Sequence, residues 1–325
     1  MVLLVLVAAC TAGCTAGCTR KPREQARPSP VPVGPGVVAS SIAAARIDSG
    51  KSLTVGGNRP VEVYVPRSVA SGKPAPLLIM LHAFGANAAL EEWFFRFGGH
   101  AEARGFVYVA PEGTPGPEGK QYWNATNACC APPPGALVGS DASAPPNDVE
   151  YLRELVGEIA SRVDVDPKRV FVVGHSNGGF MAHRLACDHA ELFAAIVSVA
   201  GSTWADATRC KPSTSVSVLQ IHGTADATIS INGGMFFGNN YPSARAAVEH
   251  WVGNDACTKF PIEDPTPLDL DLRVPGSETN VRRWVGCRNN TTVELWTMNG
   301  SSHIPLTSAA MAPAILDFLF AHPKP

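Results

Sequence analysis

The sequence has little net charge, because its 26 Lys and Arg residues nearly balance its 28 Asp and Glu residues over 325 positions. It lacks a basic stripe with interleaved aromatic residues, so nothing in it predicts a nucleic-acid partner. It also lacks CxxC pairs, clustered histidines and internal repeats, so neither a metal site nor a repeat architecture is expected. With 45% apolar residues, the chain is long enough for one large hydrophobic core or two small ones.

The N-terminus has the composition of an export signal. Residues 1–18, "MVLLVLVAACTAGCTAGC", form an apolar run too short to span a bilayer, followed by small residues. "VAAC" resembles a bacterial lipobox, which predicts a signal peptide of lipoprotein type with lipidation at Cys10, or alternatively at Cys14 or Cys18. A plain cleaved signal remains the alternative. Export to the medium or to the cell envelope is expected either way, and membrane attachment would occur through the N-terminal lipid.

The next segment, residues 19–45, is rich in Pro, Arg and Gly without helical or strand periodicity, which predicts an extended tether. Residues 46–325 are then expected to form a single domain. This domain contains six cysteines, and an even number in an exported chain indicates disulfides. Local spacing favours Cys187 with Cys210 and Cys257 with Cys287. The adjacent Cys129 and Cys130 would bridge each other or stay free.

Short apolar runs ending at Gly or polar residues alternate with helical patterns along this domain. The runs predict strands covered on both faces, and the patterns between them predict helices. The expected fold class is therefore α/β, with a mainly parallel central sheet and helices on both faces. Ligands of such sheets collect beyond the carboxyl ends of the strands, so candidate functional residues should directly follow strands.

One such position is Ser176 in "VFVVGHSNGGF", where G-x-S-x-G lies between an expected strand and an expected helix. Glycines two positions on either side give the backbone room for a sharp turn, which leaves the serine hydroxyl exposed. The N–H of Asn177 then starts the helix without a partner and is suited to bind a developing oxyanion. A purely structural Gly/Ser turn is the alternative interpretation.

A nucleophilic serine needs a base, and the base needs an acid that orients it. Asp226 in "IHGTADATI" and His303 in "MNGSSHIPL" each follow an expected strand, in the chain order Ser, Asp, His. Asp206, Asp255, Asp264, Asp269 and Asp271 lack such placement. The backbone N–H of Phe84, after the strand "PLLIML", is the expected second oxyanion donor. These residues predict nucleophilic catalysis by Ser176, with His303 as its base and Asp226 as the orienting acid.

The chain resembles the polyhydroxybutyrate depolymerase and feruloyl esterase group of exported α/β-hydrolases, which is similar to family-one carbohydrate esterases. The resemblance rests on several motifs in the same order: "VDVDPKRVFVVGHSNGGFMAHRLACDHAELFAAIVSVAG", "LQIHGTADATI", "WNATNACC" and "GSSH". It covers most of the chain from about residue 46. It implies the α/β-hydrolase fold, hydrolysis of polyester, aryl or short-acyl esters without a cofactor, and the two disulfide pairs favoured by spacing.

The substrate contacts expected from the sequence are His175, beside the nucleophile, and the loop aromatics Trp123 and Trp204. An acetylxylan-type or other acyl esterase, a serine peptidase or acyltransferase on the same fold, and a non-catalytic binding lipoprotein stay open as alternatives. The sequence carries no signal for the oligomeric state.

Overall fold

The computed structural model describes residues 51–69, 73–116, 119–130 and 145–325. The predicted signal peptide at residues 1–18, its candidate lipid-bearing cysteines and the predicted tether at residues 19–45 lie outside the described residues. The boundary of the folded domain at residue 46 therefore stays a prediction.

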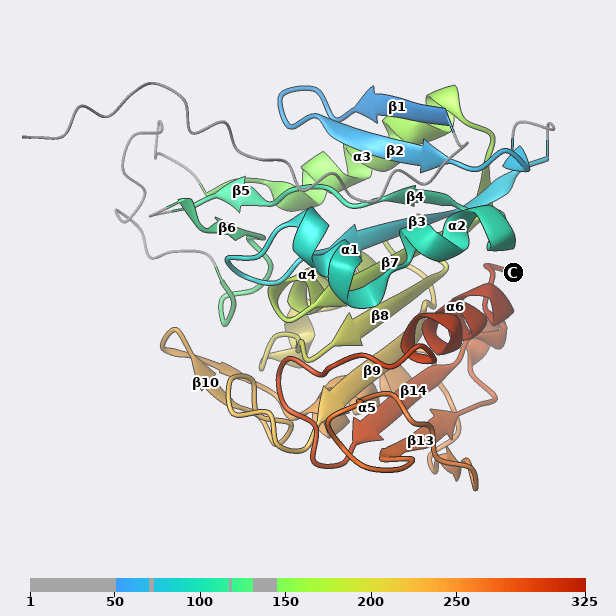
Figure 1. Ribbon diagram of the computed structural model, residues 1–325. Coiled ribbons are helices and arrows are strands. Elements are labelled where there is room, and N and C mark those ends of the chain that lie inside the picture. Colours follow the sequence, from blue (N-terminus) through green and yellow to red (C-terminus); the bar gives the residue numbers. More distant parts are fainter. Residues whose placement is uncertain (1–50, 70–72, 117–118, 131–144) are drawn as a thin grey trace, which may run out of the picture. The chain divides into compact units, whose positions relative to one another are not determined.

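A ten-stranded mixed sheet forms the centre of the molecule, and its six middle strands are parallel (Figure 1). In spatial order these are β4 (Val107–Val109), β3 (Ala75–Leu81), β7 (Val165–His175), β8 (Ala195–Val199), β9 (Ser217–Gly223) and β14 (Val293–Met298). Antiparallel strands extend both edges. They are β1 (Lys51–Val55) and β2 (Val61–Val65) beside β4, and β13 (Thr279–Trp284) and β12 (Ile262–Glu263) beside β14.

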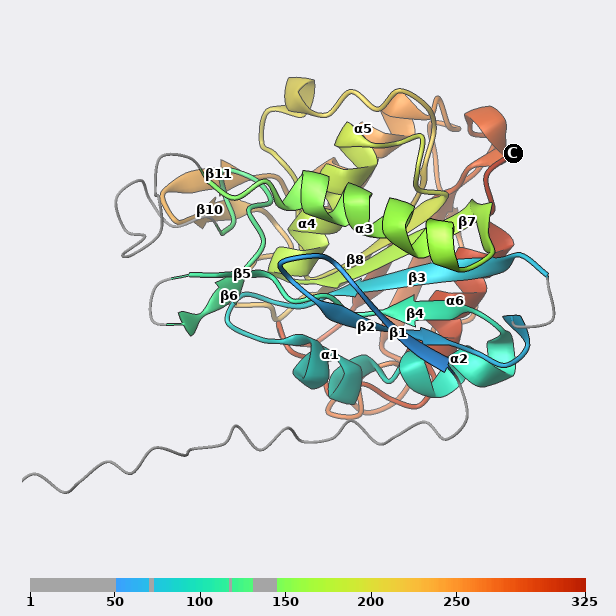
Figure 2. The same ribbon diagram turned by 90° about the horizontal axis from the view of Figure 1, so that it is seen from above.

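Helices cover both faces of this sheet (Figure 2). The first face carries α3 (Asp148–Arg162), α4 (Asn177–Asp188) and α5 (Ala244–Asn254), and the second carries α1 (Ala88–Phe95), α2 (Gly98–Arg104) and α6 (Met311–Ala321). Successive strand residues supply the two cores alternately. In β7, Val172 packs under the first layer, and Phe171 and Val173 pack under the second. Each such fully buried side chain stabilises the fold by about 1.5–3 kcal/mol relative to exposure.

Two small hairpins lie outside the main sheet: β5 (Thr114–Pro115) with β6 (Gln121–Tyr122), and β10 (Gly234–Phe236) with β11 (Asn239–Tyr241). Short 3-10 turns span Ala207–Arg209 and Arg288–Asn290. Disulfides join the two pairs favoured by spacing, Cys187 with Cys210 and Cys257 with Cys287. Cys129 and Cys130, which were expected either to bridge each other or to stay free, form a disulfide with each other.

The predicted mainly parallel sheet with helices on both faces is confirmed, because the strongest apolar patterns fall on the elements that build it. Asn147 caps α3 by accepting a hydrogen bond from Glu150 N. The helices α1 and α2 and the edge strands β12 and β13 were not expected from the sequence. These elements are short or half-exposed, so their hydrophobic patterns are weak.

Candidate active site

Ser176 lies on the sharp turn between β7 and α4, with φ 52° and ψ −114°. A side-chain-bearing residue rarely adopts positive φ, and such strain persists only where the surroundings fix it. Here, Ser176 N donates to Val199 O at 2.8 Å, and Phe180 N donates to Ser176 O at 3.0 Å. Both ends of the turn are thus held, and the hydroxyl stands at the carboxyl edge of the sheet.

Two glycines make this turn possible. A Cβ on Gly174 would lie 2.0 Å from Gly178 O, and a Cβ on Gly178 would lie 2.1 Å from Leu81 O. The second contact brings the first turn of α4 against the end of β3. The loop that follows β3 therefore lies beside the serine turn.

The structure brings together the three side chains predicted as a triad. His303 Nε2 lies 2.9 Å from Ser176 Oγ, and His303 Nδ1 lies 2.8 Å from Asp226 Oδ2. Because a carboxylate only accepts, Nδ1 carries the proton in this arrangement and Nε2 is free to accept the serine proton. The imidazole side chain is 14% exposed, the carboxylate is fully buried and Ser176 is 7% exposed.

Asp226 is held by more than His303. Its Oδ1 accepts hydrogen bonds from Thr228 N and Ile229 N, and His222 Nε2 lies 3.4 Å from its Oδ2. Burial alone would raise the pKa of Asp226, but the hydrogen bonds from His222, His303 and Ile229 N outweigh burial and lower it well below its usual value. Asp226 is therefore a fixed anion across the whole range in which His303 could exchange a proton.

The loop that carries His303 is anchored by a buried aspartate, Asp271, for which the sequence predicted no role. Asp271 accepts from Ser301 Oγ at 2.6 Å and from Leu306 N at 3.0 Å, on opposite sides of His303. Thr307 Oγ1 also donates to Phe94 O on α1 at 2.6 Å. Asp271 lies in an irregular segment, and nothing in its local sequence distinguishes it from a solvated acid. Such a role becomes visible only in three dimensions.

The two backbone amides expected to bind an oxyanion are those of Asn177 and Phe84. They flank the place where Gly178 of α4 packs against Leu81 O at the end of β3. Asn177 N is the first N–H of α4 and has no carbonyl of its own helix to bind. Among the described residues, Phe84 N has no hydrogen-bond acceptor, whereas its neighbours Ala83 and Gly85 donate to Glu91 Oε1 and Gln121 O. The loop is thus fixed on both sides of the Phe84 amide.

Trp123, expected from the sequence to contact substrate, is 0% exposed. Its indole N–H donates to His82 O at 3.1 Å, and its backbone exchanges two hydrogen bonds with the Asn177 side chain. Trp123 therefore supports the α4 turn from inside the core. Trp204 is also largely buried at 6% exposure, with the Arg209 guanidinium over its ring, and offers no platform for a ligand.

His175, the third predicted substrate contact, is also buried. Its Nδ1 lies 3.2 Å from Glu91 Oε1, and its Nε2 lies 3.1 Å from the backbone oxygen of His303. The ring packs between Phe94 and Phe95 of α1. No signal in the sequence marks Glu91, because a glutamate in "AALEEWFF" looks like an ordinary solvated helix residue.

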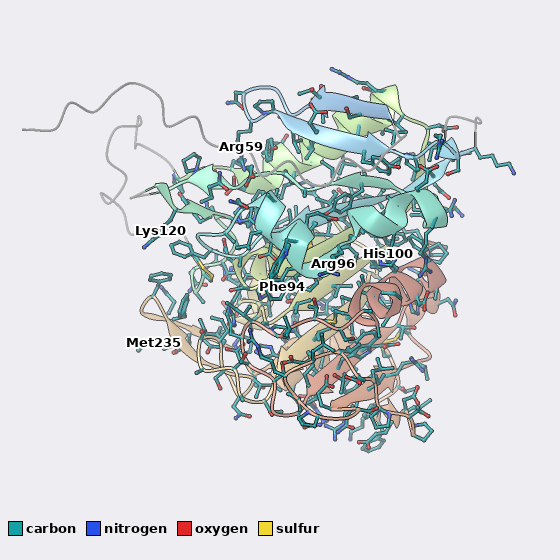
Figure 3. The ribbon with its side chains drawn as sticks, viewed as in Figure 1. Arg59, Phe94, Arg96, His100, Lys120 and Met235 are labelled. Carbon is teal, nitrogen blue, oxygen red and sulfur yellow. A yellow bond between two sulfur atoms is a disulfide. The ribbon has the colours of Figure 1, made fainter. Side chains whose placement is uncertain are left out.

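Exposed aromatic side chains lie beside the oxyanion loop. Phe84 is 38% exposed, and its ring centroid lies 6.0 Å from that of Phe237, which is 57% exposed. Phe237 occupies the turn between β10 and β11 at φ 46°, where Asn or Gly would be less strained. Met235, labelled in Figure 3, is also exposed on this hairpin. A bulky apolar residue in a strained, exposed turn indicates a functional surface.

Among the described residues, no group of three or more His, Cys, Asp and Glu side chains is arranged to hold a metal ion. None of the described helices combines the length and apolar character needed to cross a bilayer. A hollow of about 450 Å³ lies between β13, β14 and α6, lined by residues such as Trp296 and Phe318, and contains no triad residue.

The sheet order and the Ser176–His303–Asp226 chain define the molecule as an α/β-hydrolase with a serine triad. The family model described as "Putative esterase" matches residues 52–250, and the chain belongs to this family. It is 29% identical over 253 residues to "Feruloyl esterase B" of Piromyces equi, and the matched region covers 75% of this chain and 42% of the relative. It is 24% identical over 266 residues to "Poly(3-hydroxyalkanoate) depolymerase C" of Paucimonas lemoignei, and the matched region covers 76% of this chain and 59% of that relative.

The chain thus spans about half the length of these curated relatives. Among solved structures, "Acetyl xylan esterase from Aspergillus awamori" superposes with a TM-score of 0.55 at 15% identity, covering 84% of this chain and 99% of that one. At this identity, the likeness bears on the fold alone, and it agrees with the α/β-hydrolase architecture described above.

Proposed function

We propose that the protein is a serine carboxylic ester hydrolase that works through an acyl-serine intermediate. The observation that carries this proposal is the continuous chain from Asp226 Oδ2 through both nitrogens of His303 to Ser176 Oγ. The strained turn that presents Ser176 beside two amides suited to an oxyanion supports the same chemistry. Family membership adds independent support.

In this proposal, Ser176 Oγ attacks the ester carbonyl carbon while His303 Nε2 takes the hydroxyl proton. The carbonyl oxygen becomes an oxyanion, which receives hydrogen bonds from Phe84 N and Asn177 N. The carbon–oxygen bond to the alcohol then breaks, and His303 returns the proton to the leaving alkoxide. Water, activated by the same imidazole, releases the acid and restores Ser176. Asp226 holds the Nδ1–H tautomer and stabilises the imidazolium.

The surroundings favour an ester with an apolar or aryl group. Phe84 and Phe237 form an aromatic wall next to the proposed oxyanion site, and both rings are exposed enough to contact a ligand. A short-acyl or aryl ester, or one unit of a hydroxyalkanoate polyester, matches such a wall. The names of the feruloyl esterase and polyhydroxyalkanoate depolymerase relatives are consistent with this class.

We also propose that the protein is exported. Three disulfides in the described residues require an oxidising compartment to persist. The leader at residues 1–18 supports the same route, with lipid attachment at Cys10 as the anchored form. Metabolic labelling with a fatty-acid analogue in a bacterial host, compared between wild type and Cys10→Ser, tests the anchor. If Cys10→Ser is still labelled, Cys10 is not the lipid-bearing residue and another residue carries the lipid.

The activity is tested with p-nitrophenyl acetate, p-nitrophenyl butyrate, methyl ferulate, acetylxylan and polyhydroxybutyrate film, using wild type and Ser176→Ala. We expect turnover of at least one ester by wild type and a loss of at least about 10³-fold in Ser176→Ala. Hydrolysis of a peptide substrate with none of the esters cleaved would favour the peptidase alternative. Turnover that survives in Ser176→Ala would refute the proposed nucleophile.

A further inference from the structure

A buried ion pair lies directly behind the proposed active site and contacts both of its working loops. Glu91 and His175 are 3% and 4% exposed at their side chains, and Glu91 Oε1 lies 3.2 Å from His175 Nδ1. The same Oε1 accepts a hydrogen bond from Ala83 N at 3.0 Å, next to the Phe84 amide. His175 Nε2 lies 3.1 Å from the backbone oxygen of His303. One carboxylate therefore connects the oxyanion loop to the loop of the base.

The contacts of His175 determine its protonation. Both partners, the Glu91 carboxylate and the His303 carbonyl, only accept hydrogen bonds, whereas neutral imidazole carries a single N–H. Both contacts are made at once only by the imidazolium. Burial alone would lower the pKa of His175, but the charge and hydrogen bond of Glu91 and the His303 carbonyl raise it above its usual value. Burial likewise opposes the charge of Glu91, and His175 lowers the pKa of Glu91 below its usual value.

The rings of α1 shield this pair from water. The Phe94 ring, labelled in Figure 3, stacks on His175 with centroids 6.1 Å apart and planes 21° apart, and Phe95 packs edge-on at 5.8 Å. Thr307 Oγ1 donates to Phe94 O, so the same helix also holds the far side of the His303 loop. A buried pair of this kind costs desolvation energy and contributes little net stability. Its contacts with both loops therefore point to a role in geometry and charge.

We propose that Glu91 is a positioning residue for the acyl-transfer site: through the imidazolium of His175 it fixes the backbone of His303, and through Ala83 N it fixes the oxyanion loop. This inference rests on the proposed esterase function and adds to it a residue outside the triad. His175 acts as the second member of the same device. Neither residue touches the reacting atoms, and both act through the groups that do.

The imidazolium also acts on His303 by charge. The ring centroids of His175 and His303 are 5.6 Å apart, so a positive charge on His175 lies close enough to repel a positive charge on the His303 ring. The other ionisable group in contact with His303 is Asp226, which His222 approaches at 3.4 Å. On its own side, Glu91 also interacts with His82. Loss of the Glu91 charge should therefore change the pH dependence as well as the rate.

The test compares Glu91→Gln and His175→Gln with wild type on the preferred p-nitrophenyl ester. The Glu91→Gln variant keeps a side-chain oxygen for Ala83 N but removes the charge that keeps His175 protonated. The His175→Gln variant keeps an amide N–H for the His303 carbonyl. We expect kcat to fall about 10- to 100-fold in Glu91→Gln with KM within about twofold of wild type. The acid limb of kcat/KM should move to higher pH by about 0.5 to 1 unit.

The matched control is Glu294→Gln, which neutralises an equally buried carboxylate at the amino end of β14, paired with Arg283. It should leave kcat and the pH profile unchanged. The double variant Glu91→Gln/His175→Gln should lose no more than the worse single variant, because both residues form one unit. If circular dichroism shows that Glu91→Gln is unfolded, the kcat, KM and pH profile of His175→Gln alone test the proposal.

The esterase activities of wild type and Ser176→Ala are measured first. If wild type is inactive, or if Ser176→Ala is as active as wild type, the esterase proposal itself has failed, and this outcome is recognised separately. If wild type is active, unchanged kcat and an unmoved acid limb in the Glu91→Gln and His175→Gln variants would overturn the positioning role. Equal losses in Glu294→Gln would overturn it as well, because they would reflect general destabilisation.

Discussion

The two buried aspartates at opposite ends of β9 differ in what surrounds them. Asp226 follows the carboxyl end of β9, has hydrogen-bond partners on both oxygens, and has a pKa well below its usual value. Asp255 lies near the residues that precede β9 and β14 and binds Thr291 Oγ1, but among the described residues its Oδ1 has no partner. Burial, the largest influence, raises the pKa of Asp255 to about 7. Burial disfavours the ionised form of both aspartates. Among the described residues, Asp226 at the carboxyl end of β9 has enough hydrogen-bond donors to stay ionised, and Asp255 does not.

The two ends of the sheet therefore serve different purposes. At the carboxyl end, hydrogen bonds connect Asp226, His303 and Ser176 into a chain that ends at the serine hydroxyl. At the amino end, the carboxyl of Asp255 lies beside the Cys257–Cys287 disulfide region and joins no comparable chain of described residues. Substitution of Asp226 should reduce activity, and substitution of Asp255 should change stability without reducing activity.

The largest expected effect is that of Asp226→Asn. The amide would donate toward His303 Nδ1 and favour the tautomer whose Nε2 carries the proton, so the serine would lose its base. We expect kcat to fall by about 10³- to 10⁴-fold, measured on a p-nitrophenyl ester. Asp255→Asn is the paired control and should retain activity. Equal activity losses in both variants would remove the distinction between the two ends.

The next effect tests the close packing at the carboxyl edge. In Gly178→Ala, the new Cβ would lie 2.1 Å from Leu81 O, which is main chain and cannot rotate away. We expect a loss of about 3 kcal/mol or more in unfolding free energy, or no folded protein. Gly157→Ala on α3 is the control, because no atom lies within 4 Å of its added Cβ and the helix should gain about 0.5 to 1 kcal/mol. Denaturant unfolding of both variants measures the contrast.

The sequence predicted the serine turn well because its determinants are local. A strand, two glycines and a helix within a few residues leave few alternatives, and Asp226 and His303 follow strands whose apolar runs are clear. The contacts of His175, Trp123 and Trp204 could not be assigned in this way. An aromatic or histidine in a loop has the same local pattern whether it faces the site or the core, and only tertiary packing decides.

The same reasoning explains the residues that were missed. Glu91 lies on an eight-residue helix with a weak pattern, and Asp271 lies in a segment without periodicity. Their importance comes from partners far away in the chain: His175 is 84 residues from Glu91, and Ser301 is 30 residues from Asp271. A single sequence contains no record of such long-range pairs.

A moderate effect on stability is expected from Asp255→Asn. The raised pKa means that folded Asp255 binds its proton more tightly than unfolded Asp255 does, so the unfavourable contribution is absent below about pH 4 and grows until pH exceeds about 7. Removing the charge should stabilise the protein by about 1 to 4 kcal/mol at pH 8 and by less at pH 5. Thermal unfolding between pH 5 and pH 8 measures this trend. A stabilisation independent of pH would show that Asp255 does not titrate in this range.

The smallest effect is expected at the aromatic wall. Phe237→Ala should raise KM for aryl or butyryl esters about 3- to 10-fold and leave the acetyl ester nearly unchanged, because it removes apolar contact area near the acyl or aryl group. Phe260→Ala, which removes another exposed ring at 76% exposure, is the control. Matching KM changes in both variants would mean that the wall has no special role in binding.

The central claim is that Ser176 becomes covalently acylated with the help of His303 and Asp226. The most direct measurement is mass spectrometry of the protein after reaction with a fluorophosphonate, with the modified peptide sequenced. We expect one phosphonyl group per chain on Ser176, with labelling slower by about 10³-fold or more in Asp226→Asn. Full esterase activity in a protein labelled at another residue, or not labelled at all, would contradict it.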